Sequence, residues 1–167
     1  AGGITPIKLA LAGSAVSAIL SSLVSLILLP RADVMDAYRF WQVGSLSGAT
    51  WVSIKAVLPF LIVGFVISIV STPALNALSL GDELATGLGV NTGLVRILCA
   101  IAGVILCGAT TAIAGPIGFV GLMIPHTIRL IFGSDMKNLI PMSAIGGAII
   151  LTISDVIGRI IGSPSEL

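Results

Sequence analysis

The feature that most constrains this chain is a set of four long windows without a charged residue. They cover residues 9–30, 56–81, 97–128 and 138–154, and are 22, 26, 32 and 17 residues long. A helix needs about 20 mostly apolar residues to cross a bilayer, within a working range of about 17–25. Three windows are long enough to span a membrane, and the fourth lies at the lower limit. The pattern predicts an all-α, polytopic membrane protein.

Composition excludes the other broad classes of protein. Only 9% of the 167 residues are charged and 56% are hydrophobic, whereas an ordinary soluble domain carries about 25% charged residues. A soluble fold of this size leaves much of its surface wet and has no room to hide so many apolar side chains. The net charge of +1 gives no basic surplus for nucleic acid, and the high hydrophobicity excludes disorder.

Prolines and glycines divide the apolar windows into five predicted spans. Pro30, Thr72-Pro73 and Gly115-Pro116 interrupt the windows, and proline does not continue a helical hydrogen-bond ladder. The piece after Gly115-Pro116 is short and contains Pro125, so it is either a short tilted span or a partly broken one. The predicted spans cover residues 7–29, 52–71, 94–114, 117–132 and 139–161 of one membrane-embedded unit, 1–167.

Two polar segments separate these spans. Residues 31–50 are expected to form a polar loop with tryptophans near its ends, as is typical of a membrane interface. Residues 74–93 are expected to lie outside the bilayer and to contain a short amphipathic helix. Asp82 and Glu83 are signals for its start, and Gly87 and Gly89 are signals for its end. Lysine and arginine divide four against four between the two sides, so their count leaves the orientation open.

Residues with obvious chemistry are sparse. The chain has one histidine, His126, and its two cysteines, Cys99 and Cys107, lie about 12 Å apart along one predicted helix. That separation is too long for a disulfide. There is no Gly-x-x-x-x-Gly-Lys-[Ser/Thr] run to form a nucleotide-binding loop. We therefore expect no enzymatic activity, metal or cofactor in this chain.

Several short motifs follow one another in an order typical of one transporter family. The longest is Ala-Gly-Pro-Ile-Gly-Phe-Val-Gly-Leu-Met-Ile-Pro-His at 114–126, with Arg129 and Gly-Ser-Asp at 133–135 after it. The others are Leu-Ala-Gly at 11–13, Trp-Gln-Val-Gly-Ser-Leu-Ser-Gly at 41–48, Leu-Asn-Ala-Leu-Ser-Leu-Gly at 75–81, Ala85 with Leu-Gly-Val at 88–90, and Asp155 with Arg159. In this arrangement the chain resembles FecCD/BtuC-type permeases of ABC importers for iron–siderophore complexes, haem and cobalamin.

The resemblance implies a larger assembly. Such permeases have ten transmembrane helices, and this chain is similar to helices five to nine, so we expect a fragment of a longer subunit. The implied partners are a second permease copy in a homodimer, cytoplasmic subunits that hydrolyse ATP, a periplasmic or lipid-anchored substrate-binding protein and membrane lipid, with no nucleic acid. The implied location is the bacterial inner membrane. Residues 72–93 and 133–138 would face the cytoplasm, and residues 31–50 and the C-terminal end the outside.

The resemblance also assigns a coupling role to the most polar segment. In the family, this segment forms a short helix that docks on the ATPase. The alternative from the bare residues is an ordinary solvated turn with an acidic cap. The residues implied in coupling are Leu80, Gly81, Asp82, Glu83, Leu84, Ala85, Leu88, Gly89 and Val90.

Arg159 is the implied contact for the substrate-binding protein. It lies near the outer end of the last predicted span, where an arginine offers a bidentate contact to a carboxylate. Asp155 would orient it. The simpler alternatives are an i,i+4 ion pair between the two and an arginine that snorkels to lipid headgroups.

The resemblance also implies roles for two further groups of residues. Gly13, Ser14 and Ser17 would line the translocation path, with Thr5 and Pro6 near its cytoplasmic gate, although small residues are also ordinary packing positions. The second group is a structural signature around Pro125. Proline frees a backbone carbonyl of its helix, and the side chain of His126 or Arg129 would supply a hydrogen-bond partner for it. The alternative is that His126 is a metal ligand or a proton relay. The full signature is Gly115, Pro116, Gly118, Gly121, Pro125, His126 and Arg129.

A rival class is an ion-coupled secondary transporter or channel. Such a protein needs an acidic side chain near the middle of a span, because ionisable groups inside a membrane mark ion pathways. The one acidic residue within a predicted span is Asp155, and it lies near the end of that span. Co-purification of an ATPase with the full protein would separate the two classes.

Overall fold

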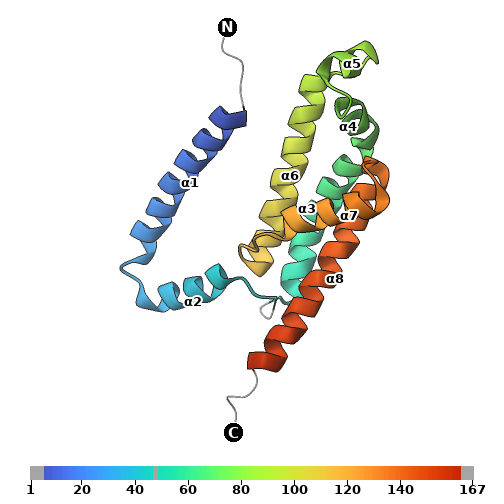
Figure 1. Ribbon diagram of the computed structural model, residues 1–167. Helices are drawn as coiled ribbons and strands as arrows, with labels where there is room; N and C mark the ends of the chain where they lie inside the picture. The colour runs from blue at the N-terminus through green and yellow to red at the C-terminus, as the bar shows by residue number, and fades with distance from the viewer. Residues whose placement is uncertain (1–5, 47–48, 163–167) are drawn as a thin grey trace. The chain divides into compact units, whose positions relative to one another are not determined.

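The computed structural model describes residues 6–46 and 49–162, and all regular elements in these ranges are α-helices (Figure 1). The chain divides into two compact units, residues 1–43 and 44–167, which are described separately. Among the described residues, four stretches are long and apolar enough to cross a membrane: Ala10–Leu28, Trp51–Val70, Thr92–Ala114 and Met136–Ile161. The all-α membrane fold expected from the sequence is confirmed.

The first unit contains α1 (Pro6–Leu28) and α2 (Ala32–Val43). Hydroxyls along α1 donate to carbonyls three or four residues earlier, for example Ser22 Oγ to the Ala18 carbonyl at 2.8 Å. Such bonds satisfy the hydroxyl inside the helix, which suits an apolar surrounding.

The expectation of a polar loop over residues 31–50 is wrong, because α2 occupies much of it. The charges that indicated a loop lie at helical spacing. Arg39 Nη1 is 3.5 Å from Asp36 Oδ1, and the rings of Tyr38 and Trp41 stack with centroids 5.7 Å apart. Within each pair the two residues are three apart, so the two side chains of that pair lie on the same face of the helix.

The second unit is built around α3 (Trp51–Val70) and α6 (Thr92–Ala114), which pack along each other (Figure 1). Each begins at a capping side chain. Thr50 accepts a hydrogen bond from Ser53 N, and Asn91 accepts one from Leu94 N. These caps satisfy amides that have no partner within the helix. They explain why each helix starts where it does.

Small residues allow α3 and α6 to approach closely. Val95, Ala102 and Ala109 are buried at seven-residue spacing on α6, and Gly64 is buried on α3. A Cβ atom on Gly64 would lie 2.7 Å from Leu106 Cγ. Membrane helices lack a hydrophobic force that drives them together, so close van der Waals packing of this kind holds them in register.

The segment expected to form one short helix forms two. The second span, predicted over residues 52–71, ends at Val70, and α4 (Thr72–Leu78) then follows with Pro73 in its first turn. A proline fits there because the first amides of a helix have no intrahelical acceptor. A turn through Gly81, at φ 107°, then leads into α5 (Asp82–Gly87).

The last two helices form a second packed pair. Residues 115–119 are not helical, and α7 covers Val120–Phe132, which is 13 residues or about 20 Å. That is shorter than the hydrocarbon core of about 30 Å. α7 packs on α8 (Met136–Gly162). A Cβ atom on Gly146 of α8 would lie 3.0 Å from Ile124 Cγ2, so a small residue again sets the approach.

Replacing Gly64 with alanine should destabilise the α3–α6 pair. The new methyl group would lie 2.7 Å from Leu106 Cγ, and overpacking of this kind costs about 1–3 kcal/mol. The measurement is thermal unfolding of the purified permease that contains this chain. Leu106→Ala in the same background reopens the space, so the double variant should lose less than the sum of the two single losses. Strict additivity would contradict the close contact.

Candidate functional site

The α4–α5 turn lies at one end of the second unit (Figure 1), and it carries an exposed apolar surface. Leu80, Leu84 and Leu88 are 62%, 61% and 66% exposed. Leu84 and Leu88 are four residues apart, a spacing that places side chains on the same side of a helical turn. We call these three residues the leucine patch.

The end of α5 is fixed by a Schellman motif. Gly89 N donates to the Thr86 carbonyl at 2.9 Å, and Val90 N donates to the Ala85 carbonyl at 3.0 Å. Gly89 has φ 80°, a left-handed conformation that glycine adopts without steric cost. Ala85 itself is fully buried. These contacts give a helix of only six residues a defined end and a defined inner face.

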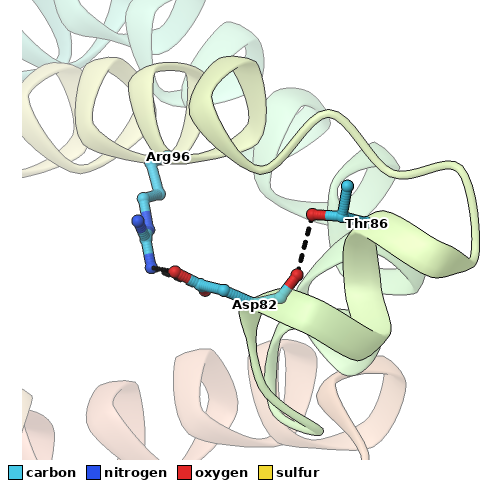
Figure 2. Close-up of polar contacts among 3 residues, drawn as sticks. All are labelled: Asp82, Thr86 and Arg96. Carbon is cyan, nitrogen blue, oxygen red and sulfur yellow. Dashed lines mark hydrogen bonds and ion pairs between the residues drawn. The ribbon is translucent and has the colours of Figure 1, made fainter.

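An ion pair fixes the start of α5 to the first turns of α6 (Figure 2). Arg96 Nη2 donates to both carboxylate oxygens of Asp82, each at 2.8 Å. Thr86 Oγ1 donates to the Asp82 carbonyl at 2.8 Å. Both charged side chains are more than half exposed, so we expect the pair to contribute no more than about 1 kcal/mol.

This ion pair differs from the roles suggested by the sequence. Asp82 makes no capping hydrogen bond to the α5 backbone, because the N-cap position is occupied by Gly81. Its partner lies 14 residues away on the next helix, a separation at which no local pattern indicates contact. Glu83, the second acidic residue of α5, is exposed.

A second polar contact joins α4 to the start of α8. Asn76 Nδ2 donates to Asp135 Oδ1 at 2.7 Å, and Met136 N donates to Asn76 Oδ1 at 2.9 Å. Asp135 Oδ1 also accepts from Lys137 N at 3.0 Å. The hydrogen bond from the Lys137 amide, followed by the one from Asn76, lowers the pKa of the Asp135 carboxyl, because both stabilise the charged form. The sequence predicts no role for Asn76 or Asp135 themselves.

The predicted docking pair lies at the other end of α8. Arg159 Nε donates to Asp155 Oδ2 at 2.8 Å. The Arg159 side chain is 61% exposed and that of Asp155 is 26% exposed. Arg159 lies about 35 Å along the helix from Met136 at 1.5 Å per residue. The structure therefore brings Asp155 and Arg159 together, and separates them from the α4–α5 turn by the length of α8.

The glycine-proline signature forms the break before α7. Gly115 is buried with φ 73°, and Ser45 N donates to the Ala114 carbonyl at 2.9 Å. Gly118 lies in the break and Gly121 in the first turn of α7; a Cβ atom on either glycine would meet nothing within 4 Å. Residues 115–119 thus form a non-helical connection between α6 and α7.

The histidine and arginine of the signature do not cap the carbonyl that Pro125 frees. Pro125 lies inside α7, with His126 and Arg129 exposed. Among the hydrogen bonds of the described residues, neither side chain bonds to a carbonyl of this helix. The described residues also contain no group of three or more His, Cys, Asp or Glu side chains able to hold a metal ion.

The predicted path residues lie on α1 in the first unit. Gly13, Ser14 and Ser17 are exposed, and Ser14 Oγ donates to the Leu11 carbonyl at 2.9 Å. Pro6 is the first residue of α1, and Thr5 lies outside the described residues. Their role in a translocation path stays a prediction.

Four membrane-length helices with a short two-helix turn define a polytopic membrane protein. Residues 1–167 match the FecCD transport family, and the chain belongs to that family. The family match and the apolar helices together confirm the resemblance drawn from the motifs and the expected location in a bacterial cell membrane.

Individual relatives agree with this membership. The Fe(3+)-citrate import system permease protein YfmD of Bacillus subtilis is 41% identical over 165 residues, covering 99% of this chain and 49% of its own length. The ferric enterobactin transport system permease protein FepD of Escherichia coli is 42% identical over 167 residues, covering 99% and 49%. The chain therefore spans about half the length of these relatives.

A solved structure has the same fold. It is an ABC transporter assigned to the metal-chelate type, in an inward-facing conformation. It matches with a TM-score of 0.84 and 29% identity, covering 98% of this chain and 53% of its own.

The lowered pKa of Asp135 predicts a specific acid dependence. The carboxyl titrates near 3.8 when unperturbed and lower in the folded chain. Its contribution to stability is therefore present above about pH 4 and is lost as pH falls through the folded pKa. Thermal unfolding of the full permease at pH 6 and pH 3 should show a smaller acid loss for Asp135→Asn than for the unsubstituted protein. Equal losses would contradict this role of the carboxylate.

Proposed function

We propose that this chain supplies half of the permease subunit of a binding-protein-dependent ABC importer for iron chelates. The observation that carries the proposal is the match to the FecCD transport family along residues 1–167. The chain itself forms part of the membrane path, and ATP is hydrolysed on a separate subunit. This division of labour agrees with the absence of a nucleotide-binding loop from the sequence.

The names of the relatives favour an iron(III) chelate as the transported molecule. One relative is named for Fe(3+)-citrate and another for ferric enterobactin, and the structural relative is of the metal-chelate type. Haem and cobalamin are the alternatives within the family resemblance. Uptake of radioactive iron(III)-citrate, iron(III)-siderophore, haem and cobalamin by cells carrying the full permease distinguishes them.

We assign ATPase docking to the leucine patch. Three exposed leucines on one turn form an apolar surface that gains about 25 cal/mol for each Å² removed from water. The turn is anchored on both sides, by the Asp82–Arg96 ion pair and by the buried Ala85. A movement of the ATPase would therefore reach α6 through an element that is in direct contact with it. Alternating access then follows when ATP binding favours one of two arrangements of the helices.

The proposed importer also includes a second copy of the permease and a substrate-binding protein. Two copies of the full permease form a homodimer around the path, with Gly13, Ser14 and Ser17 of α1 lining it. Arg159 at the outer end of α8 receives an acidic side chain of the substrate-binding protein, and Asp155 holds the guanidinium in place through the 2.8 Å hydrogen bond.

An ion-coupled transporter is a weaker reading of this chain. Among the described membrane-length helices, the acidic residue is Asp155 of α8. It lies toward the helix end and pairs with Arg159. An ion pathway needs such a group at mid-membrane.

Charged substitutions in the leucine patch should abolish ATPase docking. We expect Leu84→Asp with Leu88→Asp in the full permease to lose co-purification of the ATPase, because a carboxylate would have to be desolvated at the interface. Leu84→Met with Leu88→Met keeps the apolar volume and should retain the ATPase. Unchanged co-purification of the ATPase with the aspartate variant would refute the assignment.

Reversal of the charge at Arg159 should weaken docking of the substrate-binding protein. We expect Arg159→Glu to lower the affinity at least about tenfold, since an arginine–carboxylate contact would become a repulsion. Arg159→Lys keeps the charge and loses the bidentate geometry, so its affinity should be intermediate. The measurement is binding of the substrate-binding protein to the full permease in lipid nanodiscs. Equal affinity of the glutamate variant and the unsubstituted permease would remove Arg159 from the interface.

A further inference from the structure

The contact between Asn76 and Asp135 joins two parts of the molecule with different proposed tasks. Asn76 lies on α4, which a three-residue turn connects to α5 and its leucine patch. Asp135 directly precedes α8, whose far end carries Asp155 and Arg159. The two side chains are 59 residues apart in sequence, so their contact is tertiary.

The chemistry of this contact depends on an amide side chain at position 76. The Asn76 amide uses both of its ends, since Nδ2 donates to Asp135 Oδ1 and Oδ1 accepts from Met136 N. An aspartate at position 76 has no donor for the first bond. Asp135 Oδ1 receives a second hydrogen bond, from Lys137 N. The Asn76 side chain of α4 is therefore bonded both to Asp135 and to the first backbone amide of α8, that of Met136.

The first turns of α8 are also held by apolar packing. α4 packs against α8, and Leu139, in the first turn of α8, is only 5% exposed. α8 then continues as one helix for 27 residues, about 40 Å at 1.5 Å per residue. Because the helix continues through Pro141, we expect a displacement at its start to reach its other end. α8 thus connects the α4–α5 turn physically to the Asp155–Arg159 pair.

We infer that Asn76 and Asp135 are positioning residues that transmit movement of the α4–α5 turn to α8. The inference rests on the proposed function, in which that turn docks on the ATPase and Arg159 meets the substrate-binding protein. ATP binding would shift α4, the Asn76–Asp135 contact would carry α8 with it, and the outer contact would change. Coupling between two sites is reciprocal in binding free energy. Docking of the substrate-binding protein therefore acts on the ATPase through the same contact.

The test uses the full permease with its ATPase and substrate-binding protein in proteoliposomes. The variants are Asn76→Ala, Asp135→Ala, their combination and Asp135→Asn, with Asn138→Ala as the control. Asn138 is an exposed asparagine in the first turn of α8, so its loss removes an amide of the same size outside the contact. The readouts are substrate transported per ATP hydrolysed and stimulation of the ATPase by the substrate-binding protein.

We expect Asn76→Ala and Asp135→Ala each to lower both readouts by about fivefold or more, the lower end of typical coupling between sites. The combination should lose less than the sum of the two single changes, because both remove the hydrogen bond between Asn76 and Asp135. Asp135→Asn should keep most of the coupling, since its Oδ1 accepts the same two hydrogen bonds. Asn138→Ala should behave as the unsubstituted permease, and all variants should retain the ATPase.

Three results would overturn the inference: normal readouts in both alanine variants, strictly additive losses in the combination, or an Asp135→Asn variant as defective as Asp135→Ala. If the first of these results came with a lower melting temperature, the contact would be only structural. Where Asn76→Ala fails to assemble, the comparison of the Asp135→Ala and Asp135→Asn variants decides.

The leucine-patch variant distinguishes failure of this inference from failure of the proposed function. If it releases the ATPase while Asn76→Ala is normal, the inference alone fails; if it keeps the ATPase, the proposed function fails first.

Discussion

The close approach of α3 and α6 at Gly64 is the contact on which the second unit depends. These two helices are the first and last members of the sequence α3–α4–α5–α6. Their packing therefore fixes both attachment points of the α4–α5 turn. Because a single added carbon at Gly64 would reach Leu106 Cγ at 2.7 Å, the geometry of the turn depends on the absence of a side chain at that position.

The membrane helices could be predicted from the sequence because lipid imposes a strict rule. Every backbone amide and carbonyl in the hydrocarbon region needs an internal partner, so a long charge-free window there is helical. The polar segments obey no such rule. Charges at positions 36 and 39 fit a loop as well as a helix, and the sequence reading missed α2 for this reason. It also missed the division of the α4–α5 segment, which follows from the positive φ of Gly81.

The contacts that tie the candidate site together were beyond sequence reasoning for a different reason. The Asp82–Arg96 pair spans 14 residues and the Asn76–Asp135 contact spans 59. Both depend on where helices turn and how they pack. By contrast, the Asp155–Arg159 pair was open to prediction, since four residues is one helical turn. The family resemblance identified the important segments, whereas only the structure shows which side chains bond to one another.

The shortness of α5 has a consequence for partner binding. A six-residue helix is well below the length at which an isolated helix is stable in water. Its order comes from the Schellman motif, the buried Ala85 and the ion pair to α6. The conformational entropy of this turn is therefore lost during folding of the permease. A partner that docks there meets a preorganised surface, and less of its binding free energy is consumed in ordering the turn.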